Sequence, residues 1–184
     1  MKQRLLERLL EEKETRLKGG LYHQTQINFA YHTNKIEGSR LSEDQVRYIY
    51  ETNTVTMEMD KMAAEDDIIE TVNHFSCFDY MLLHADEELT EDLIKGFHLL
   101  LKRNTSDANK EWFRIGGYKL RPNMVGGGKT TAPSKVGSEI QKLLSDYTRR
   151  KEITVEDIVD FHYRFECIHP FQDGNGRVGR IIMF

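Results

Sequence analysis

Apolar residues recur with a helical period along most of this 184-residue chain, but the period vanishes between Asn104 and Pro133. In that interval, GGYKLRPNMVGGGK predicts two short extended runs about a Pro122-Asn123 turn. A lone hairpin is marginal in water, so it must lie on the helices. The predicted fold class is therefore mainly α with one β-hairpin.

Capping signals divide the helical pattern into segments. Gly19 and Gly20 end the first helix, and Ser42 with Gln45 forms a capping box. The later predicted helices cover residues 24–37, 42–49, 60–84, 90–104, 134–147 and 154–167. The longest has one apolar face, which predicts that it runs through the core. That face carries Ile68, Val72, Phe75, Phe78 and Leu82.

Length and charge bound the class of protein. The chain suits one domain, and we expect N-terminal helices at 1–55 and a single compact core at 56–184. It stops at RIIMF, within an apolar helical pattern, which predicts either a further C-terminal segment in a longer chain or a tightly docked end. The net charge of −4 counts against a general nucleic-acid binder.

The sequence also indicates the compartment. The N-terminus lacks the apolar core of a signal peptide, and no apolar run approaches the roughly 20 residues that a membrane-spanning helix needs. We therefore expect a cytoplasmic protein that is not inserted in a membrane. Cys77 and Cys167 lie far apart among apolar residues, which predicts buried free thiols rather than a disulfide.

The segment 169–180, HPFQDGNGRVGR, lies between two helical patterns. Gly174 and Gly176 allow consecutive N–H groups to converge, and the following helix adds the positive end of its dipole. This pattern predicts an anion site. Arg177 and Arg180 lie three residues apart on that helix and can offer planar forks of donors to phosphate oxygens. Together these features favour a polyphosphate ligand.

Three more side chains complete the segment. Asp173 would repel phosphate unless a cation lay between them, and Mg²⁺ is the cation that combines carboxylate with phosphate oxygens. His169 is suited to accept a proton from an incoming hydroxyl. Phe171 is expected to anchor the loop in the core. Each residue alone is usually a turn or solvated residue, but their concentration within twelve positions favours function.

These residues resemble the signature of the Fic (filamentation induced by cAMP) family. That signature is histidine, any residue, phenylalanine, any residue, aspartate or glutamate, GNGR, two residues, arginine, and HPFQDGNGRVGR matches every fixed position. The likeness spans about residues 60–184. It implies a Fic-type helical core and transfer of AMP from ATP to a hydroxyl of a target protein, with release of pyrophosphate. The implied roles are general base for His169, Mg²⁺ ligand for Asp173, anion hole for Gly174, Asn175 and Gly176, and phosphate grip for Arg177 and Arg180.

A second segment, TNKIEG at 33–38, resembles the inhibitory motif of the same family. Thr33 and Glu37 lie one turn apart at the end of a predicted helix, and Gly38 suits the position just past its end. The resemblance implies that Glu37 pairs with Arg180 and keeps the γ-phosphate of ATP from seating productively. A bidentate Arg–carboxylate pair is a strong competitor for those donors. We therefore expect inhibition within the chain, with no separate antitoxin partner.

The hairpin from about Tyr118 to Pro133 matches the position of the family's flap, which is implied to bind the target by adding a strand beside it. A purely structural hairpin is the alternative. The residues expected to dock the target are Tyr118, Lys119, Val125 and Gly126.

Two other patterns are rejected. NMVGGGKT ends like a P-loop, but Asn123 replaces its first glycine and no helical pattern starts at Lys129. His162, Cys167 and His169 lack a second histidine or cysteine pair at metal-ligand spacing.

The sequence thus predicts a Mg²⁺- and ATP-dependent protein adenylyltransferase inhibited by Glu37. Its expected partners are ATP, a protein substrate that can be the chain itself, and a second copy in a homo-oligomer. Several alternatives stay open: removal of AMP from a modified protein with Glu37 positioning water, transfer of another nucleotide-derived group or phosphate, and a non-catalytic nucleotide-binding adaptor for protein or DNA.

Overall fold

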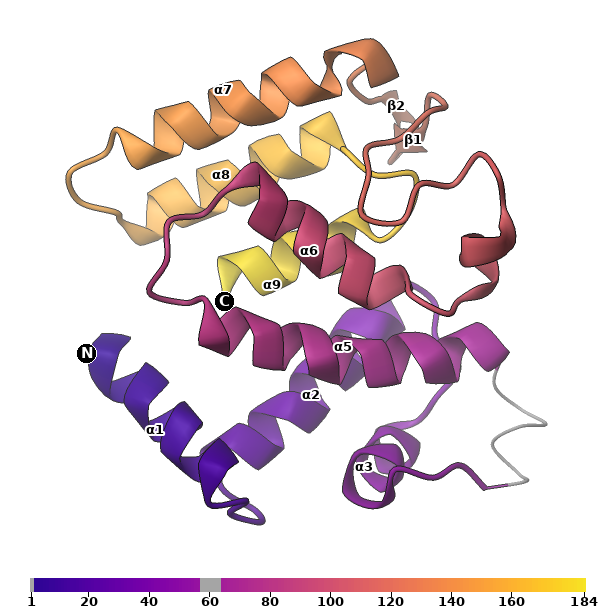
Figure 1. The fold of residues 1–184 in the computed structure, drawn as a ribbon, viewed down its shortest axis with the longest axis vertical. Helices are drawn as coiled ribbons and strands as arrows, with labels where there is room; N and C mark the ends of the chain where they lie inside the picture. Colours follow the sequence, from indigo (N-terminus) through magenta and orange to yellow (C-terminus); the bar gives the residue numbers. More distant parts are fainter. Residues whose placement is uncertain (1, 57–63) are drawn as a thin grey trace. The chain divides into compact units, whose positions relative to one another are not determined.

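The computed structural model describes residues 2–56 and 64–184. The chain divides into two compact units, Met1–Asp86 and Glu87–Phe184. Both are built from helices, and the second also carries a two-stranded antiparallel hairpin (Figure 1). The predicted fold class, mainly α with one hairpin, is confirmed. Across the described residues, no helix combines the length and the apolar character needed to cross a membrane.

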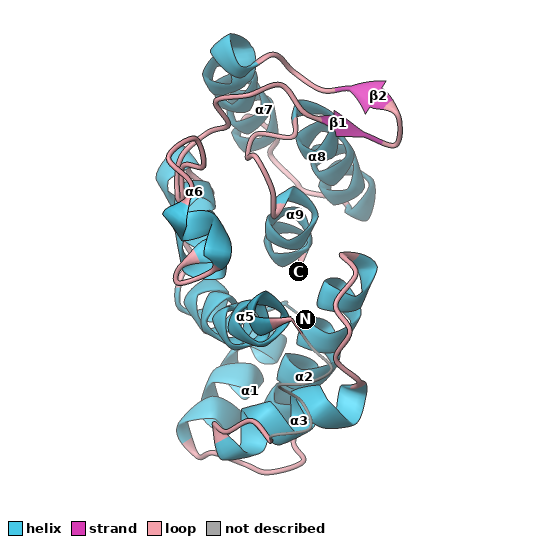
Figure 2. Ribbon diagram, turned by 90° about the vertical axis from the view of Figure 1, so that its right-hand side faces the viewer, coloured by secondary structure: helices cyan, strands magenta, loops and turns pink. Residues whose placement is uncertain are grey.

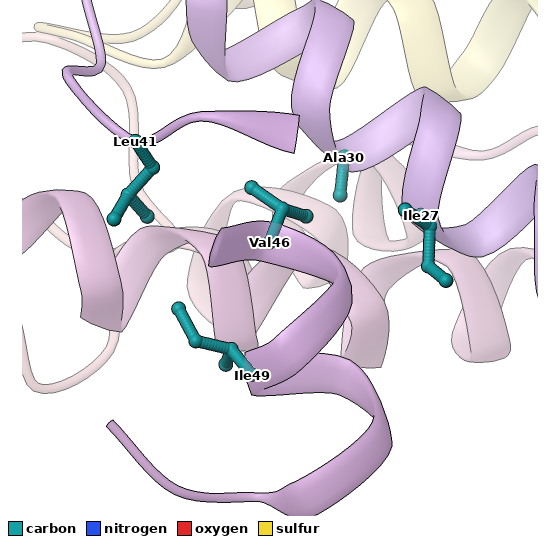
Figure 3. Close-up of a cluster of buried hydrophobic side chains, with 5 residues drawn as sticks. All are labelled: Ile27, Ala30, Leu41, Val46 and Ile49. Carbon is teal, nitrogen blue, oxygen red and sulfur yellow. The ribbon is translucent and has the colours of Figure 1, made fainter. Parts of the chain in front are cut away.

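The N-terminal unit is organised around one helix that contacts its neighbours on several sides. Its elements are α1 (Lys2–Glu14), α2 (Leu21–Ile36), α3 (Glu43–Thr52) and α5 (Glu65–Leu83). Helix α2 packs on α1, α3 and α5. Five buried side chains gather where α2 meets α3 and the segment before it (Figure 3); they are Ile27, Ala30, Leu41, Val46 and Ile49.

The predicted capping box at the start of α3 is confirmed. The Gln45 N–H donates to Ser42 Oγ at 3.2 Å, and the Ser42 N–H donates to Gln45 Oε1 at 2.8 Å. Helix α2 begins at Leu21 rather than residue 24 because a distant carboxylate serves its first turn. Glu12 Oε2 accepts the Tyr22 N–H at 2.8 Å, and a Cβ on Gly20 would lie only 2.5 Å from that oxygen.

The predicted apolar face of α5 is partly wrong. Phe78 and Leu82 are buried as expected, but Val72 is 43% exposed. The buried face instead includes polar residues, among them Thr71, whose hydroxyl donates to the Asp67 carbonyl at 2.7 Å. Ile68 and Phe75 also pack against the core as predicted, so hydrophobicity alone misassigned only Val72. The predicted start of this helix at residue 60 lies outside the described residues.

The C-terminal unit contains the remaining helices and the hairpin. Its elements are α6 (Glu91–Lys102), η1 (Ser106–Asn109), β1 (Met124–Val125), β2 (Gly128–Lys129), η2 (Pro133–Lys135), α7 (Val136–Thr148), α8 (Val155–Ile168) and α9 (Asn175–Met183). Helix α8 packs between α7 and α9, and α6 also contacts both of these helices. Figure 2 shows the hairpin projecting at one end of this unit.

The hairpin turns at a different place from the predicted one. Val125 pairs with Gly128 and Met124 with Lys129, so Gly126 and Gly127 form the turn, with φ of +54° and +79°. A tight two-residue hairpin turn of this kind requires positive φ at both central positions, which glycine adopts without strain. Pro122-Asn123 precedes the first strand instead, so that prediction was wrong.

Two further predictions can be compared with the structure. Both cysteines are free, but only Cys77 is buried, because Cys167 lies on an outer face of α8 and is exposed. By packing, α5 groups with the N-terminal helices. The predicted boundary after residue 55 separates the N-terminal helices from a family core, and it stays a prediction.

Candidate active site

The candidate site begins where α8 ends. His169 occupies the C-cap in the left-handed conformation, with φ 51° and ψ 63°, and its N–H donates to the Phe165 carbonyl at 2.9 Å. Non-glycine residues are uncommon in this region and are held there by the surrounding structure. Pro170 then prevents the helix from continuing. The chain therefore leaves α8 abruptly, with His169 at the bend.

Phe171 fixes the loop to the core, as predicted. Its side chain is fully buried and stacks on His98 of α6, with ring centroids 4.0 Å apart and planes 3° apart. His98 Nδ1 accepts the Gly116 N–H at 2.9 Å. Burial, followed by the charge of Lys102, lowers the pKa of His98 to about 3. The histidine under the loop is therefore neutral near pH 7, and sequence reasoning did not identify it.

Asn175 closes the loop with both ends of its side-chain amide. Its Oδ1 accepts the Phe171 N–H at 2.7 Å, and its Nδ2 donates to the Phe171 carbonyl at 2.9 Å. The side chain is buried, so it satisfies two backbone groups that water cannot reach. Any contribution of Asn175 to the predicted anion hole must therefore come from its backbone N–H.

Gly174 begins α9 in a left-handed conformation, with φ 79° and ψ 6°, and no side chain caps the helix. A Cβ there would lie 3.2 Å from Leu101 Cδ2, so the position is also tight. The Val178 N–H makes the first turn's bond to the Gly174 carbonyl at 3.0 Å. The N–H groups of Asn175, Gly176 and Arg177 precede that bond and have no acceptor within the helix. This end of α9 has the form expected of an anion site.

Asp173 is held by two cations. Lys102 Nζ donates to Asp173 Oδ2 at 2.8 Å, and an Arg177 terminal nitrogen approaches the same oxygen at 3.1 Å. Lys102 is 2% exposed and also pairs with Asp107 of η1 at 2.6 Å. Burial opposes ionisation of Asp173, but the charges of Lys102 and Arg177 outweigh it and lower its pKa to about 2. Sequence reasoning identified neither Lys102 nor Asp107.

The surroundings of Asp173 fit a magnesium ion. The carboxylate is ionised, and half of its side-chain surface is exposed. The described residues contain no cluster of three or more histidine, cysteine or acidic side chains suited to hold a metal. Mg²⁺ needs no such cluster, since it commonly takes one or two protein carboxylates together with substrate phosphates and waters. Asp173 can therefore serve a metal that arrives with a nucleotide.

The two motif arginines have different environments. Arg177 is 3% exposed and directs its guanidinium to Asp173, whereas Arg180 is partly exposed one turn further along α9. They share a helix as predicted, but Arg177 is held by the loop itself. Arg180 is the more accessible of the two side chains.

Lys119 joins the base of the hairpin to the loop. Its backbone N–H donates to the Pro170 carbonyl at 2.9 Å, and its ammonium donates to the Ile168 carbonyl at 3.2 Å. The ammonium also donates to Asn123 Oδ1 and Thr130 Oγ1, both at 2.7 Å. Burial lowers the pKa of Lys119 to about 8. Lys119 thus belongs to the support of the hairpin.

The other predicted docking residues differ in exposure. Tyr118 is partly buried beneath Lys95, whose ammonium lies 4.4 Å from the ring centroid. Val125 is 45% exposed, and Gly126 lies exposed in the turn. The segment NMVGGGKT forms this hairpin rather than the strand, loop and helix of a P-loop.

The predicted inhibitory residues lie in the N-terminal unit. Thr33 is buried on α2, and Glu37 is the C-cap of that helix, with an exposed side chain. Gly38 follows at φ +96°, the left-handed conformation expected just past a helix end. The pairing of Glu37 with Arg180 stays a prediction.

The C-terminal unit is thus a helical core that presents a histidine, a carboxylate and the N-terminus of a helix on one loop. Residues 88–184 match the sequence profile of the Fic/DOC family, so the chain belongs to that family.

Curated relatives extend the likeness beyond these residues. The chain is 26% identical over 162 residues to "Protein adenylyltransferase Fic" of Nematostella vectensis, covering 83% of this chain and 35% of that protein. It is 29% identical over 131 residues to a "Probable protein adenylyltransferase" of Aquifex aeolicus, covering 68% and 40%. The chain therefore spans little more than a third of the length of these relatives.

Solved structures share the fold. A Fic domain containing signaling protein from Bacteroides thetaiotaomicron superposes with a TM-score of 0.75 at 23% identity, covering 97% of this chain and 70% of that one. Fic-1 from C. elegans superposes with a TM-score of 0.72 at 19% identity, covering 98% and 55%.

Proposed function

We propose that this chain transfers AMP from ATP to a hydroxyl side chain of a protein, with release of pyrophosphate. The observation that carries the proposal is the loop 169–175. One short segment, closed by Asn175 and anchored by Phe171, brings His169, Asp173 and the N-terminus of α9 together. The names of the curated relatives support the same reaction.

The reaction follows from the chemistry of these groups. The target hydroxyl oxygen attacks the α-phosphorus, and its proton passes to His169 Nε2. A new phosphoester bond forms while the bond to the β-phosphate oxygen breaks, so pyrophosphate leaves with the electron pair. The first N–H groups of α9, Arg177 and Arg180 would oppose the negative charge that develops on the phosphates. Such a site works mainly by positioning and electrostatic stabilisation.

Asp173 would hold Mg²⁺ together with phosphate oxygens and water. A bound Mg²⁺ would neutralise phosphate charge and help to orient the nucleotide. Lys102 and Arg177 support this role because they keep the carboxylate ionised and fixed.

The hairpin is the proposed docking site for the protein substrate. Both strands are exposed, and each is only two residues long. A strand edge can bind an extended segment through main-chain groups, leaving side-chain selection to neighbouring surfaces. The Lys119 contacts would keep a target bound there close to the loop that carries His169.

We further propose that Glu37 restrains the activity by competing for Arg180. The TNKIEG motif and the position of Glu37 at the end of α2 support this role. A cytoplasmic location, a homo-oligomeric state and modification of the chain by itself stay predictions.

The decisive experiment measures transfer of label from α-labelled ATP to protein in the presence of Mg²⁺. The variants are wild type, Glu37→Gly, and Glu37→Gly combined with His169→Ala. We expect Glu37→Gly to raise labelling by about tenfold or more, since removing one partner of a strong ion pair releases several kcal/mol of competition. His169→Ala should then lower it by at least about a hundredfold, the lower limit for loss of a general base.

Two control variants distinguish the effect of losing the Glu37 carboxylate from the effect of introducing a flexible glycine into the backbone. Glu37→Gln removes the charge while preserving the side-chain length, and should also activate. Lys35→Gly puts glycine in the same last turn of α2 and keeps Glu37, so it should not activate. Absence of label in all variants, with ATP binding intact, would contradict AMP transfer; release of AMP from a modified protein would then identify the reverse activity.

A further inference from the structure

Three polar side chains at the C-terminal end of α8 form a row that ends at His169. His162, Glu166 and His169 are spaced by four and three residues, so their side chains follow one face of the helix end. The facing residue on α9 is Gly179. A Cβ there would lie 2.7 Å from Glu166 Oε1 and 3.0 Å from His162 Nδ1. The absence of a side chain on Gly179 leaves the space that Glu166 and His162 occupy.

Three buried polar atoms in this row have no hydrogen-bond partner among the residues that the structure describes. They are His162 Nδ1, Glu166 Oε1 and His169 Nδ1. Burying such an atom unsatisfied costs about 1–3 kcal/mol, and native structures contain few of them. Three such atoms, one of them on the proposed general base itself, therefore need an explanation.

The Glu166 carboxylate lies close to His169. Glu166 Oε2 lies 3.6 Å from His169 Nδ1, slightly beyond hydrogen-bond length, and both side chains are largely buried. Hydrogen bonds between catalytic groups are often long before substrate binds and shorten in the reacting complex.

The two carbonyls that flank His169 and the carboxylate of the loop already have donors. The Ile168 carbonyl accepts from the Lys119 ammonium, and the Pro170 carbonyl accepts from the Lys119 N–H. The loop's own carboxylate, Asp173, is engaged by Lys102 and Arg177. Glu166 is thus the carboxylate placed to interact with His169.

We propose that Glu166 is a positioning residue for His169: its carboxylate accepts the Nδ1–H and so presents the Nε2 lone pair to the target hydroxyl. This inference rests on the proposed function, in which His169 is the general base, and it identifies Glu166 as the residue that orients the His169 ring. When the hydroxyl proton moves to Nε2, Nδ1 keeps its own proton, and the Glu166 carboxylate stabilises the positive imidazolium without being protonated. His162 borders the same space beside Gly179 and would help to hold the carboxylate.

The test replaces Glu166 by Gln and by Leu in the active Glu37→Gly chain. Leu removes the acceptor, and we expect kcat to fall by about tenfold to a hundredfold while KM for ATP stays within about twofold, because the base is misplaced and the nucleotide contacts are not. Gln keeps a neutral acceptor, so its kcat should lie between those of Leu and Glu. Glu156→Gln, an exposed glutamate of the same helix, is the matched control.

A spectroscopic measurement tests the contact without relying on turnover. Nitrogen-15 NMR of His169 should show the Nδ1–H tautomer in the Glu37→Gly chain, which is the parent of these variants. In the Glu166→Leu variant it should show the Nε2–H tautomer or a mixture of the two. Thermal unfolding of each variant checks that the fold is retained. An Nε2–H tautomer in the parent chain, or unchanged kcat in a folded Glu166→Leu chain, would overturn the proposal. If the parent chain shows no AMP transfer, the proposed function fails, and the tautomer still decides whether Glu166 orients His169.

Discussion

The loop 169–175 and the hairpin 124–129 differ in how firmly they are held. In the loop, Phe171 and Asn175 are buried, and the contacts described above tie the segment to itself, to α6, to Lys119 and to the flanking helices α8 and α9. In the hairpin, two-residue strands leave Met124 63% exposed. The comparison separates two demands: proton transfer and phosphate binding require fixed atoms, whereas strand addition requires an accessible edge.

The two regions are nevertheless connected through a buried lysine. Lys119 donates to the carbonyls on either side of His169 and to two side chains at the base of the hairpin. The buried contacts of Lys119 therefore hold the base of the hairpin, at Asn123 and Thr130, but not its turn. A target segment bound along the exposed strands would be held at a fixed position near His169. Because the strands bind its main chain, they would not select its amino-acid sequence.

The largest expected effect comes from the loop's ionic support. Lys102→Met leaves Asp107 and Asp173 facing each other without the buried ammonium between them. We expect the free energy of unfolding to fall by about 3 kcal/mol, the lower end for breaking a buried pair, since Asp173 is half exposed. Urea denaturation at neutral pH without metal measures this change.

Lys95→Met is the matched control because it removes another lysine of α6 that pairs with a carboxylate, Glu91, nearer the surface. That change should cost no more than about 1 kcal/mol. Equal effects of the two substitutions would show that the support of Asp173 is no stronger than an ordinary surface pair.

A second prediction concerns acid. His98 has a pKa of about 3 in the folded protein against its ordinary value near 6.5, so the unfolded chain binds the extra proton between those values. Its contribution to stability is therefore fully present above about pH 6.5 and is lost as pH falls toward 3. Urea denaturation from pH 7 to pH 4 should show the free energy of unfolding decreasing.

His98→Gln should remove the part of this pH slope that comes from His98, because glutamine can still accept the Gly116 N–H but does not titrate. The exposed His32→Gln is the matched control. If His98→Gln left the pH dependence of the free energy of unfolding unchanged, titration of His98 would not contribute to it.

The sequence revealed the chemical groups of the loop because they are contiguous. His169 to Arg180 carry their own turn and helix-start signals, so their proximity requires no knowledge of tertiary structure. The supporting residues come from elsewhere: Lys102 is separated from Asp173 by 71 residues. Read alone, Lys102 is an ordinary basic residue in the last turn of a helix, where the helix dipole favours it.

Other differences have local causes that are visible in retrospect. The two glycines of the hairpin turn were a signal for a two-residue turn, and the preceding Pro-Asn pair competed with it. Glu166 carried no signal by itself, since a glutamate three residues before a histidine is common on helices. Its significance depends on Gly179, which lies on the next helix and leaves room for the carboxylate.

The smallest global effect is expected in the hairpin. Gly127 has φ +79° and nothing within 4 Å of a built Cβ, so Gly127→Ala meets no clash but must adopt a left-handed conformation. That conformation costs about 1 kcal/mol locally. Because the strands are exposed and short, the cost should appear as a loosened hairpin while the unfolding midpoint of the whole chain barely changes.

The functional consequence should be selective. Labelling of a protein target should fall with a raised KM for that target, while ATP binding is retained, because the turn lies in the proposed docking segment and away from the buried loop contacts. Gly137→Ala introduces the same methyl group in α7, at normal φ and in open space, and should change neither quantity. If Gly127→Ala instead weakened ATP binding as strongly as it weakened target labelling, the hairpin would be part of the nucleotide site, and the separation between a fixed chemical loop and an adaptable docking edge would fail.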